Sequence, residues 1–300
     1  MSILDLVGNT PLIALKNLSE DISDVPIFGK AEFMNPSGSV KDRAAKAMIL
    51  DGIAGGKLTP GKTIIDATSG NTGIAYAMIG AVLGYKVVLY MPRNTSIERK
   101  RIISHYGAAI VETDPLEGSD GAYLAVKECV AADPERYFYP DQYNNDVNVQ
   151  THFTTTGQEI WRQTHQRVTH FLAGVGTSGT FVGSARRLKQ ENPLIKTLMV
   201  QPASPLHGIE GTKHMASSIK PGILDETLHD GVITVTTEEA YAMTRRLAKR
   251  EGIFVGVSSG ANVAAAVKLK RTLAADAVVV TMLCDTGSRY TADPFWNENL

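Results

Sequence analysis

The most reactive candidate in this chain is Lys41, which ends the polar segment Asn-Pro-Ser-Gly-Ser-Val-Lys at residues 35–41 and precedes a helical pattern at 44–51. A lysine amine can act as a nucleophile, and lysine is the residue that forms Schiff bases. The ordinary alternative is a loop lysine beside a helix cap, since most lysines are exposed and have no chemical role. Neighbouring motifs have to decide between these interpretations.

Two further loops join a β-rich run to a helical pattern and are rich in glycine and hydroxyl groups. Residues 68–73 read Thr-Ser-Gly-Asn-Thr-Gly and offer amides and hydroxyls to an anion such as a carboxylate or phosphate. An ordinary Ser/Asn helix cap explains this loop equally well. Residues 256–261 read Gly-Val-Ser-Ser-Gly-Ala, and here a serine cap before a buried helix is the better explanation when the loop is taken alone.

The loop at residues 174–180, Gly-Val-Gly-Thr-Ser-Gly-Thr, fits the pattern G-x-G-x-x-G of dinucleotide-binding proteins. A nicotinamide dinucleotide site also needs an acidic residue after the next strand, where this chain has Gln201. That residue disfavours an NAD-dependent oxidoreductase. The hydroxyl groups of Thr177, Ser178 and Thr180 instead suit a terminal phosphate monoester, because several donors can converge on one dianion.

Composition limits the class of protein. The 300 residues are 43% hydrophobic and carry 30 Lys+Arg against 31 Asp+Glu, which argues against disorder and nucleic-acid binding and favours small ligands. The apolar stretch 74–85 is too short to span a bilayer, and no secretory signal is apparent at the N-terminus. Cys129 and Cys284 lie far apart, and the seven histidines lack metal-ligand spacing, so we expect no metal and a cytoplasmic location.

Short β-rich runs alternate with helical patterns along most of the chain. The predicted strands are 63–67, 86–91, 109–112, 168–173, 197–201 and 277–283, and the predicted helices are 72–83, 95–106, 117–132, 178–191, 237–251 and 260–273. This order predicts an α/β fold with mostly parallel sheets covered on both faces. The Asn- and Asp-rich segment 141–150 reads as a loop, and we expect a domain hinge near Tyr143.

Taken together and in this order, the motifs resemble those of the cysteine synthase (O-acetylserine sulfhydrylase) family of pyridoxal-phosphate enzymes. The segments that carry the resemblance are 7–12, 35–43, 68–73, 141–145, 155–157, 176–180 and 256–260, with 251–260 most similar to the B form. The resemblance implies the two-domain parallel-sheet fold of the tryptophan-synthase-β type, fold type II of these enzymes. It also implies a smaller mobile domain at 36–143, a larger domain formed by 1–35 with 144–300, and a homodimer.

The resemblance assigns pyridoxal 5'-phosphate as cofactor and gives each loop a role. Lys41 would be the catalytic residue, forming the internal aldimine and moving the substrate Cα proton. The residues that would bind the cofactor with it are Asn71 at the 3-hydroxyl, Ser258 at the pyridine nitrogen, and Gly176, Thr177, Ser178, Gly179 and Thr180 at the phosphate. The residues that would bind the substrate carboxylate are Thr68, Ser69, Thr72 and Gln142.

The implied reaction is a β-replacement through an α-aminoacrylate, a transferase step of cysteine biosynthesis. O-acetylserine or O-phosphoserine would react with sulfide or thiosulfate to give L-cysteine or S-sulfocysteine, and Lys213 in the segment 205–215 could pair with a substrate phosphate or stay solvated. Activity like that of cystathionine β-synthase or a serine/threonine dehydratase is the alternative. A binding homologue without activity is disfavoured by the intact Lys41, and binding of a serine acetyltransferase stays open.

Overall fold

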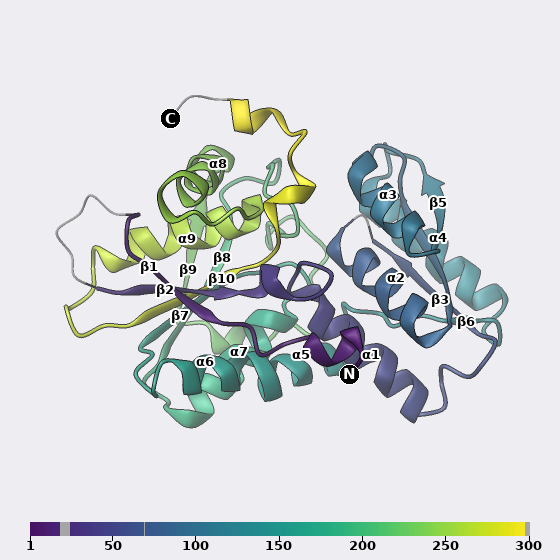
Figure 1. Ribbon diagram of the computed structural model, residues 1–300, viewed down its shortest axis with the longest axis horizontal. Helices are drawn as coiled ribbons and strands as arrows, with labels where there is room; N and C mark the ends of the chain where they lie inside the picture. Colours follow the sequence, from purple (N-terminus) through teal and green to yellow (C-terminus); the bar gives the residue numbers. More distant parts are fainter. Residues whose placement is uncertain (19–24, 69, 298–300) are drawn as a thin grey trace. The chain divides into compact units, whose positions relative to one another are not determined.

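The computed structural model describes residues 1–18, 25–68 and 70–297, and the chain divides into two compact units (Figure 1). Unit 1 consists of Met1–Val7 and Lys41–Asn148, and unit 2 consists of Gly8–Val40 and Val149–Leu300. The chain thus passes between the units directly before Lys41. The bounds predicted for the smaller domain, 36–143, leave out the N-terminal residues of unit 1 and take in the loop that unit 2 contributes before Lys41.

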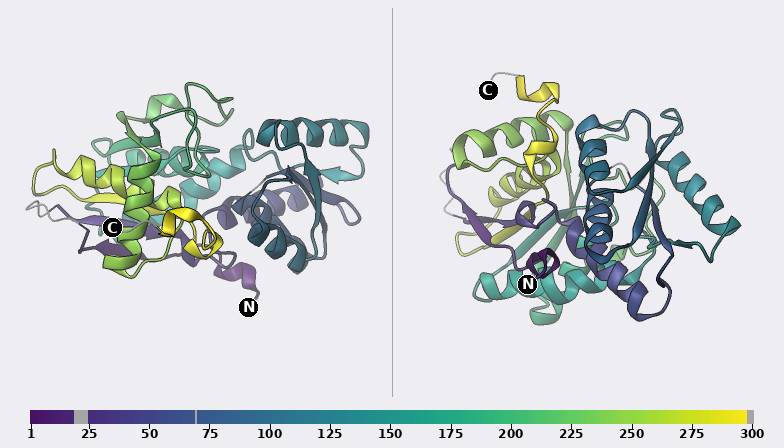
Figure 2. Two further views of the ribbon diagram at one scale, coloured as in Figure 1. Left: turned by 90° about the horizontal axis from the view of Figure 1, so that it is seen from above. Right: turned by 45° about the vertical axis from the view of Figure 1, so that its right-hand side comes forward.

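Unit 1 contains a parallel four-stranded sheet in the order β5-β4-β3-β6. Its strands are β3 (Thr63–Ala67), β4 (Lys86–Pro92), β5 (Ala109–Thr113) and β6 (Tyr137–Phe138), and its helices are α1 (Lys41–Ala54), α2 (Asn71–Leu83), α3 (Ile97–His105) and α4 (Gly118–Ala132). Helices α1 and α2 lie side by side (Figure 2), and α4 packs on β3 and β4. The helix α1 begins at Lys41, three residues before the predicted start.

The core of unit 1 is built around α2, whose residues are buried on almost every side. Such a helix must approach its sheet closely, and Gly80 permits this because a Cβ there would lie 2.3 Å from Val87 Cγ2. The N-terminal residues join the same core through buried Leu4, and Lys46 Nζ donates to the Leu4 carbonyl at 2.7 Å. These contacts explain why the first residues of the chain belong to unit 1.

Unit 2 contains a six-stranded sheet in the order β1-β2-β10-β7-β8-β9. Its strands are β1 (Leu12–Leu15), β2 (Ile27–Ala31), β7 (His170–Gly174), β8 (Lys196–Pro202), β9 (Gly231–Val235) and β10 (Val279–Leu283). All pair in parallel except β1, which runs antiparallel to β2 at the edge of the sheet. The carboxyl ends of β2, β10 and β7 therefore lie next to one another, which is the edge where α/β sheets bind ligands.

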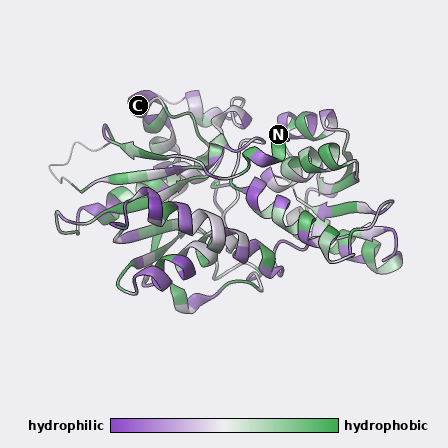
Figure 3. Cartoon of the chain, turned by 60° about the horizontal axis from the view of Figure 1, so that its bottom comes forward, coloured by the Kyte–Doolittle hydropathy of each residue, from purple (hydrophilic) through white to green (hydrophobic). Residues whose placement is uncertain are grey.

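The helices of unit 2 cover both faces of this sheet (Figure 1). Their bounds are α6 (Gln158–Gln163), α7 (Gly179–Glu191), α8 (Thr237–Arg246) and α9 (Val257–Lys270). Along β7, Leu172 packs into the cluster with α8 and α9, whereas Phe171 and Ala173 pack into the cluster with α6 and α7. Side chains alternate in this way because successive residues of a strand point to opposite faces, and Figure 3 shows hydrophobic residues along these strands.

The predicted loop at 141–150 is wrong from Asp146 onward, where α5 (Asp146–Thr151) begins. The Asn and Asp residues that suggested a loop serve as the start of a helix, since Asn145 Oδ1 accepts from the Val147 N–H at 3.0 Å. The predicted helix 237–251 is α8 followed by a π-helical turn at Leu247–Glu251. In the described ranges no helix is long and apolar enough to cross a membrane.

One buried acid lies in the centre of unit 1. Asp66 on β3 is 1% exposed, and this burial raises its pKa from 3.8 to about 7. The Ala67 N–H donates to Asp66 Oδ1 at 2.7 Å and opposes part of this rise. The unfolded chain keeps the ordinary pKa. Between pH 4 and 7 the folded protein therefore binds more protons at this site than the unfolded chain does, and stability falls as the pH rises through this range.

We expect this one carboxyl group to destabilise the protein by about 4 kcal/mol at pH 8 relative to pH 3, because each pKa unit corresponds to roughly 1.4 kcal/mol. Asp66→Asn keeps an acceptor for Ala67 and removes the buried charge. It should raise the free energy of unfolding in urea much more at pH 8 than at pH 5. Asp51→Asn, at an exposed site on α1, is the control. An equal effect of Asp66→Asn at both pH values would contradict this expectation.

Candidate functional site

Three helices that follow the predicted binding loops begin without a side-chain cap. The residue before α2 is Gly70, the one before α9 is Gly256, and Ser178 before α7 makes no capping hydrogen bond. The helix α8 has a complete capping box between Thr236 and Glu239, whereas α3, α4 and α6 also begin without a side-chain cap. The first amides of an uncapped helix have no partner within the helix and attract anions. The ordinary cap interpretation is wrong for loop 256–261, where the N-cap residue is a glycine, and in loop 68–73 the N-cap residue is Gly70.

In unit 1 the loop between β3 and α2 lies at the carboxyl edge of the sheet. The Thr68 N–H donates to the Tyr90 carbonyl at 3.0 Å, and Thr68 Oγ1 accepts from the Gly70 N–H at 3.3 Å. Asn71 is the first residue of α2. Ser69, predicted to bind substrate, lies outside the described residues.

Two of the predicted carboxylate-binding residues meet in unit 1 although they are far apart in the sequence. Thr72 Oγ1 donates to Gln142 Oε1 at 2.9 Å, and both side chains are 4% exposed. The Asn148 side chain donates to the Gln142 carbonyl at 2.8 Å and fixes the backbone of that residue. Since the Gln142 oxygen accepts from Thr72, the orientation of its amide group is set, and that group carries two N–H donors.

In unit 2 the loop after β7 fits a phosphate group. A Cβ at Gly176 would lie 2.2 Å from the Gly211 carbonyl oxygen, so that only glycine fits there. Ser178 is 3% exposed with φ of +75°, and its Oγ has no hydrogen-bond partner among the described residues. A buried hydroxyl without a partner at the start of a 13-residue helix is suited to an anionic oxygen.

A histidine that the sequence did not single out supports this loop. Thr180 Oγ1 lies 3.3 Å from His152 Nε2, and His152 Nδ1 lies 2.8 Å from Thr156 Oγ1. His152 is buried, and both of its ring nitrogens face threonine hydroxyls. No spacing signal in the sequence connects His152 with Thr180, because the contact depends on how the π-helical turn His152–Gly157 packs against α7.

Ser258 is the second residue of α9 and is buried. The next residue, Ser259, accepts through Oγ from the Cys284 N–H at 2.8 Å, which attaches the start of the helix to the chain after β10. Of the predicted site residues, Lys41 and Asn71 open helices of unit 1, whereas Gly176, Ser178 and Ser258 belong to unit 2.

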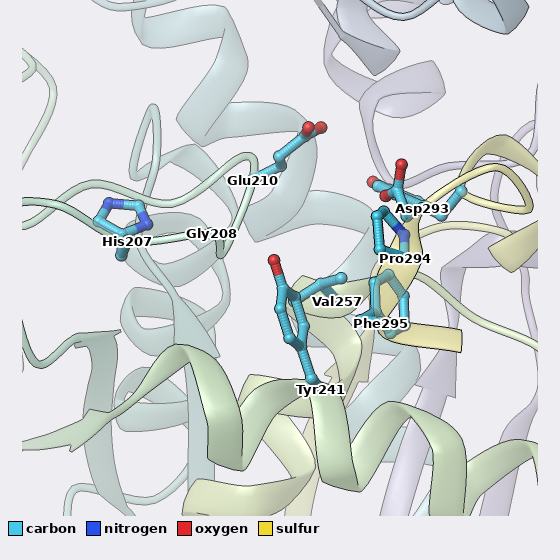
Figure 4. A pocket seen from close by; sticks show the side chains of 9 residues that line it. His207, Gly208, Glu210, Tyr241, Val257, Asp293, Pro294 and Phe295 are labelled. Carbon is cyan, nitrogen blue, oxygen red and sulfur yellow. The ribbon is translucent and has the colours of Figure 1, made fainter. Parts of the chain in front are cut away.

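Unit 2 also has a pocket of about 470 Å³ beside the start of α9 (Figure 4). It is lined by His207, Gly208, Glu210, Tyr241, Val257, Tyr290, Asp293, Pro294 and Phe295. The Tyr241 hydroxyl points toward Gly208, where a Cβ would lie 2.3 Å from its oxygen. Glu210 and Asp293 supply carboxylates, and no lysine or arginine is among the lining residues. The pKa of His207 is lowered mainly by burial and to a smaller extent by the charge of His214.

Lys213 does not line this pocket. Its backbone N–H donates to the Val175 carbonyl at 2.8 Å, beside the loop suited to phosphate. Its Nζ donates to the Ile219 carbonyl at 3.3 Å. Of the segment 205–215 that contains Lys213, the residues His207, Gly208 and Glu210 line the pocket.

Comparisons with known proteins agree with this geometry. The model of a family described as pyridoxal-phosphate dependent enzyme matches residues 3–285. A cysteine synthase from Aquifex aeolicus is 55% identical across 99% of this chain and 92% of the relative, and a cysteine synthase B from Pseudomonas aeruginosa is 42% identical across 96% and 95%.

A solved structure of a cysteine synthase from Entamoeba histolytica matches with a TM-score of 0.95 and 33% identity, covering 100% of this chain and 91% of that one. The α/β fold with parallel sheets expected from the sequence is therefore confirmed. The chain belongs to the family of pyridoxal-phosphate dependent enzymes, in its cysteine synthase branch.

Proposed function

We propose that this pyridoxal-phosphate enzyme replaces the β-substituent of O-acetylserine with sulfide and releases L-cysteine. The observation that carries the proposal is the set of three uncapped helix starts, because each opens with residues that the family motifs assign to cofactor or substrate. The names and identities of the relatives support the same reaction. Bound at these residues, pyridoxal phosphate withdraws electrons from the substrate Cα and so permits loss of a proton there and of the β-leaving group.

Residues of both units would take part in cofactor binding and proton transfer. Lys41 would hold the cofactor through its amine and then move the proton to and from the substrate Cα. The loop 176–180 would bind the phosphate through the start of α7 and the Ser178 hydroxyl, while Asn71 would contact the 3-hydroxyl. Ser258 would face the pyridine nitrogen with a neutral hydroxyl, which leaves that nitrogen unprotonated and favours β-elimination over transamination.

Thr68, Thr72 and Gln142 would bind the substrate carboxylate, together with Ser69 of the same loop. The hydrogen bond from Thr72 to Gln142 supports this role because it orients the Gln142 amide before substrate arrives. Movement of the smaller domain, predicted as 36–143, would close this loop over the carboxylate and exclude water from the reacting atoms.

Within this reaction we propose O-acetylserine rather than O-phosphoserine, and sulfide rather than thiosulfate. Glu210 and Asp293 line the pocket beside α9, and no lysine or arginine among its lining residues offers a cation to a dianionic leaving group or donor. Lys213, the cation considered from the sequence, instead donates to a backbone carbonyl. We further propose a cytoplasmic homodimer, which light scattering of the purified protein would test.

The alternatives differ in the nucleophile and the leaving group. An enzyme like cystathionine β-synthase would use homocysteine in place of sulfide, and a dehydratase would release ammonia and a keto acid from serine or threonine. Supplying these substrates one at a time, with cysteine, cystathionine and keto acid measured, separates the three activities.

Lys41→Ala should abolish the visible absorption band that the purified enzyme shows with its cofactor. It should also reduce cysteine formation by about 10³-fold or more, because it removes both the covalent attachment and the proton-transfer group. Absorption spectra and a cysteine assay with O-acetylserine and sulfide check this. Lys57→Ala, at an exposed site, should behave as wild type. A Lys41→Ala enzyme with the wild-type band and rate would refute the assignment.

Substitutions of Ser178 test whether the loop 176–180 binds the cofactor phosphate, because they affect stability and cofactor binding in opposite directions. Ser178→Gly relieves a left-handed backbone and should stabilise the cofactor-free protein by about 1 kcal/mol. The same change removes a donor to a charged group and should weaken cofactor binding by roughly 10- to 100-fold. Ser178→Ala keeps the strained backbone, so it should show only the weaker binding. Cofactor titration and urea unfolding measure both effects, and unchanged cofactor affinity in both variants would contradict this role.

Glu210→Gln should increase the rate with O-phosphoserine relative to O-acetylserine by several-fold, since it removes one like charge from the pocket. Lys213→Ala should leave the ratio of the two kcat/KM values unchanged. Both ratios come from initial rates measured at low salt, where screening is least. A Lys213→Ala enzyme that loses only its O-phosphoserine activity would restore the sequence-based alternative of a phosphate contact.

A further inference from the structure

The chain after β10 runs between two loops of unit 2. We call residues 284–290 the strap. On one side the strap faces residues 37–40, which directly precede Lys41 in the chain. On the other side it faces residues 254–256, which directly precede the first turn of α9.

The backbone of the strap bonds closely to the loop before Lys41. The Val40 N–H donates to the Cys284 carbonyl at 2.8 Å, and the Thr286 N–H donates to the Gly38 carbonyl at 3.1 Å. The guanidinium of Arg289 donates to the Ser37 carbonyl. Together these bonds hold Ser37, Gly38 and Val40, directly before the point where the chain leaves unit 2.

The opposite side of the strap holds the turn before α9 in the same manner. The Gly256 N–H donates to the Asp285 carbonyl at 3.0 Å, and the Gly287 N–H donates to the Phe254 carbonyl at 3.0 Å. Val255 and Thr286 form an antiparallel bridge between these two bonds. The strap therefore acts as a short strand shared by both loops.

Glycines allow the strap to lie this close to both neighbours. Gly38 has φ of +86°, and a Cβ there would lie 3.0 Å from a Thr286 methyl and 3.1 Å from Arg289 Nη2. A Cβ at Gly256 would lie 2.3 Å from Asp285 Oδ1, and one at Gly287 would lie 2.8 Å from the Phe254 ring. Van der Waals contact thus leaves little room for either loop to shift against the strap.

Arg289 is the charged member of this arrangement, and it is 4% exposed. A buried guanidinium needs hydrogen-bond acceptors, and its planar set of five donors can hold a carbonyl at a defined angle. The strap beyond it is secured by Tyr290, whose hydroxyl donates to Asp285 Oδ2 at 2.7 Å and whose carbonyl accepts from Trp296 Nε1 at 2.8 Å. Arg289 therefore joins a fixed segment to the Ser37 carbonyl.

We infer that the strap positions both Lys41 and Ser258, and that Arg289 is the positioning residue on the lysine side. It acts through Ser37 and the loop 37–40 rather than by touching the reacting atoms. This inference deepens the proposed function and rests on it for the roles of the two positioned residues. The bonds of the strap to its two loops stand independently of any cofactor.

The test compares Arg289→Met and Arg289→Lys with wild type, and uses Arg186→Met as control. Arg186 lies at the surface of the same unit in an exposed ion pair with Asp225. Hydrogen exchange of the full-length protein, followed by mass spectrometry, reports the loop directly. Exchange in peptides covering 35–44 should rise at least tenfold in Arg289→Met, rise less in Arg289→Lys, and stay unchanged in the control.

Kinetics and spectra then separate positioning from general loss of structure. In Arg289→Met we expect kcat to fall about tenfold while KM for O-acetylserine stays within twofold. The strap bonds to the loop that leads directly into Lys41, whereas Thr72 and Gln142 follow much later in the chain. The visible band of the bound cofactor should shift or broaden in Arg289→Met and return toward wild type in Arg289→Lys. Unchanged exchange at 35–44 in a folded Arg289→Met protein would overturn the inference.

A second pair of variants decides the matter if Arg289→Met does not fold. Thr286 has φ of −70°, which suits proline, and Thr286→Pro removes the N–H that donates to Gly38. Thr286→Val keeps that N–H and loses only the hydroxyl. Faster exchange at 35–44 in the proline variant alone supports the inference, and equal exchange in both refutes it. Faster exchange at 35–44 in the variants, together with a wild-type enzyme that makes no cysteine, would refute the proposed function and leave the inference about the strap standing.

Discussion

The parallel pairing of β10 with both β2 and β7 is the constraint on which the rest of unit 2 depends. Parallel strands end at the same edge of a sheet, so this pairing brings together three loops that are far apart in the sequence. The first leads to Lys41, the second is the strap, and the third is the loop suited to phosphate. Hydrophobic clusters on both faces of the sheet keep this edge fixed, and the loops that follow it contain residues predicted to bind ligands.

The helix starts at these loops lack the side-chain caps that would stabilise them. A side-chain cap stabilises a helix by about 1 kcal/mol, and α8 has one. The helices α2, α7 and α9 lack such caps, and Ser178 adds a left-handed backbone to this deficit. A bound anion can satisfy the same amides, so the cofactor and the substrate carboxylate would complete these helices as well as react there.

The sequence predicted the strands β3, β4, β5, β7, β8 and β10, because these are short apolar runs bounded by turn residues, but it missed β1, β6 and β9. It misread 146–150, since Asn145 both suggests a loop and starts a helix. It did not reveal the strap, whose bonds to the loop before Lys41 join residues about 250 positions apart, mostly through backbone groups that any sequence carries. Roles that follow from family motifs, such as the contact of Asn71 with the cofactor 3-hydroxyl, stay predictions.

The order of the strands also bears on how the chain folds as it is synthesised. Every strand of the unit 1 sheet lies between Thr63 and Phe138, so that sheet can close early. In unit 2, β2 ends at Ala31 but its parallel partner β10 begins only at Val279. Sheets that join distant segments form slowly and expose unpaired edges in the meantime. A growing chain therefore completes unit 1 first and keeps one edge of β2 open until the residues of β10 emerge.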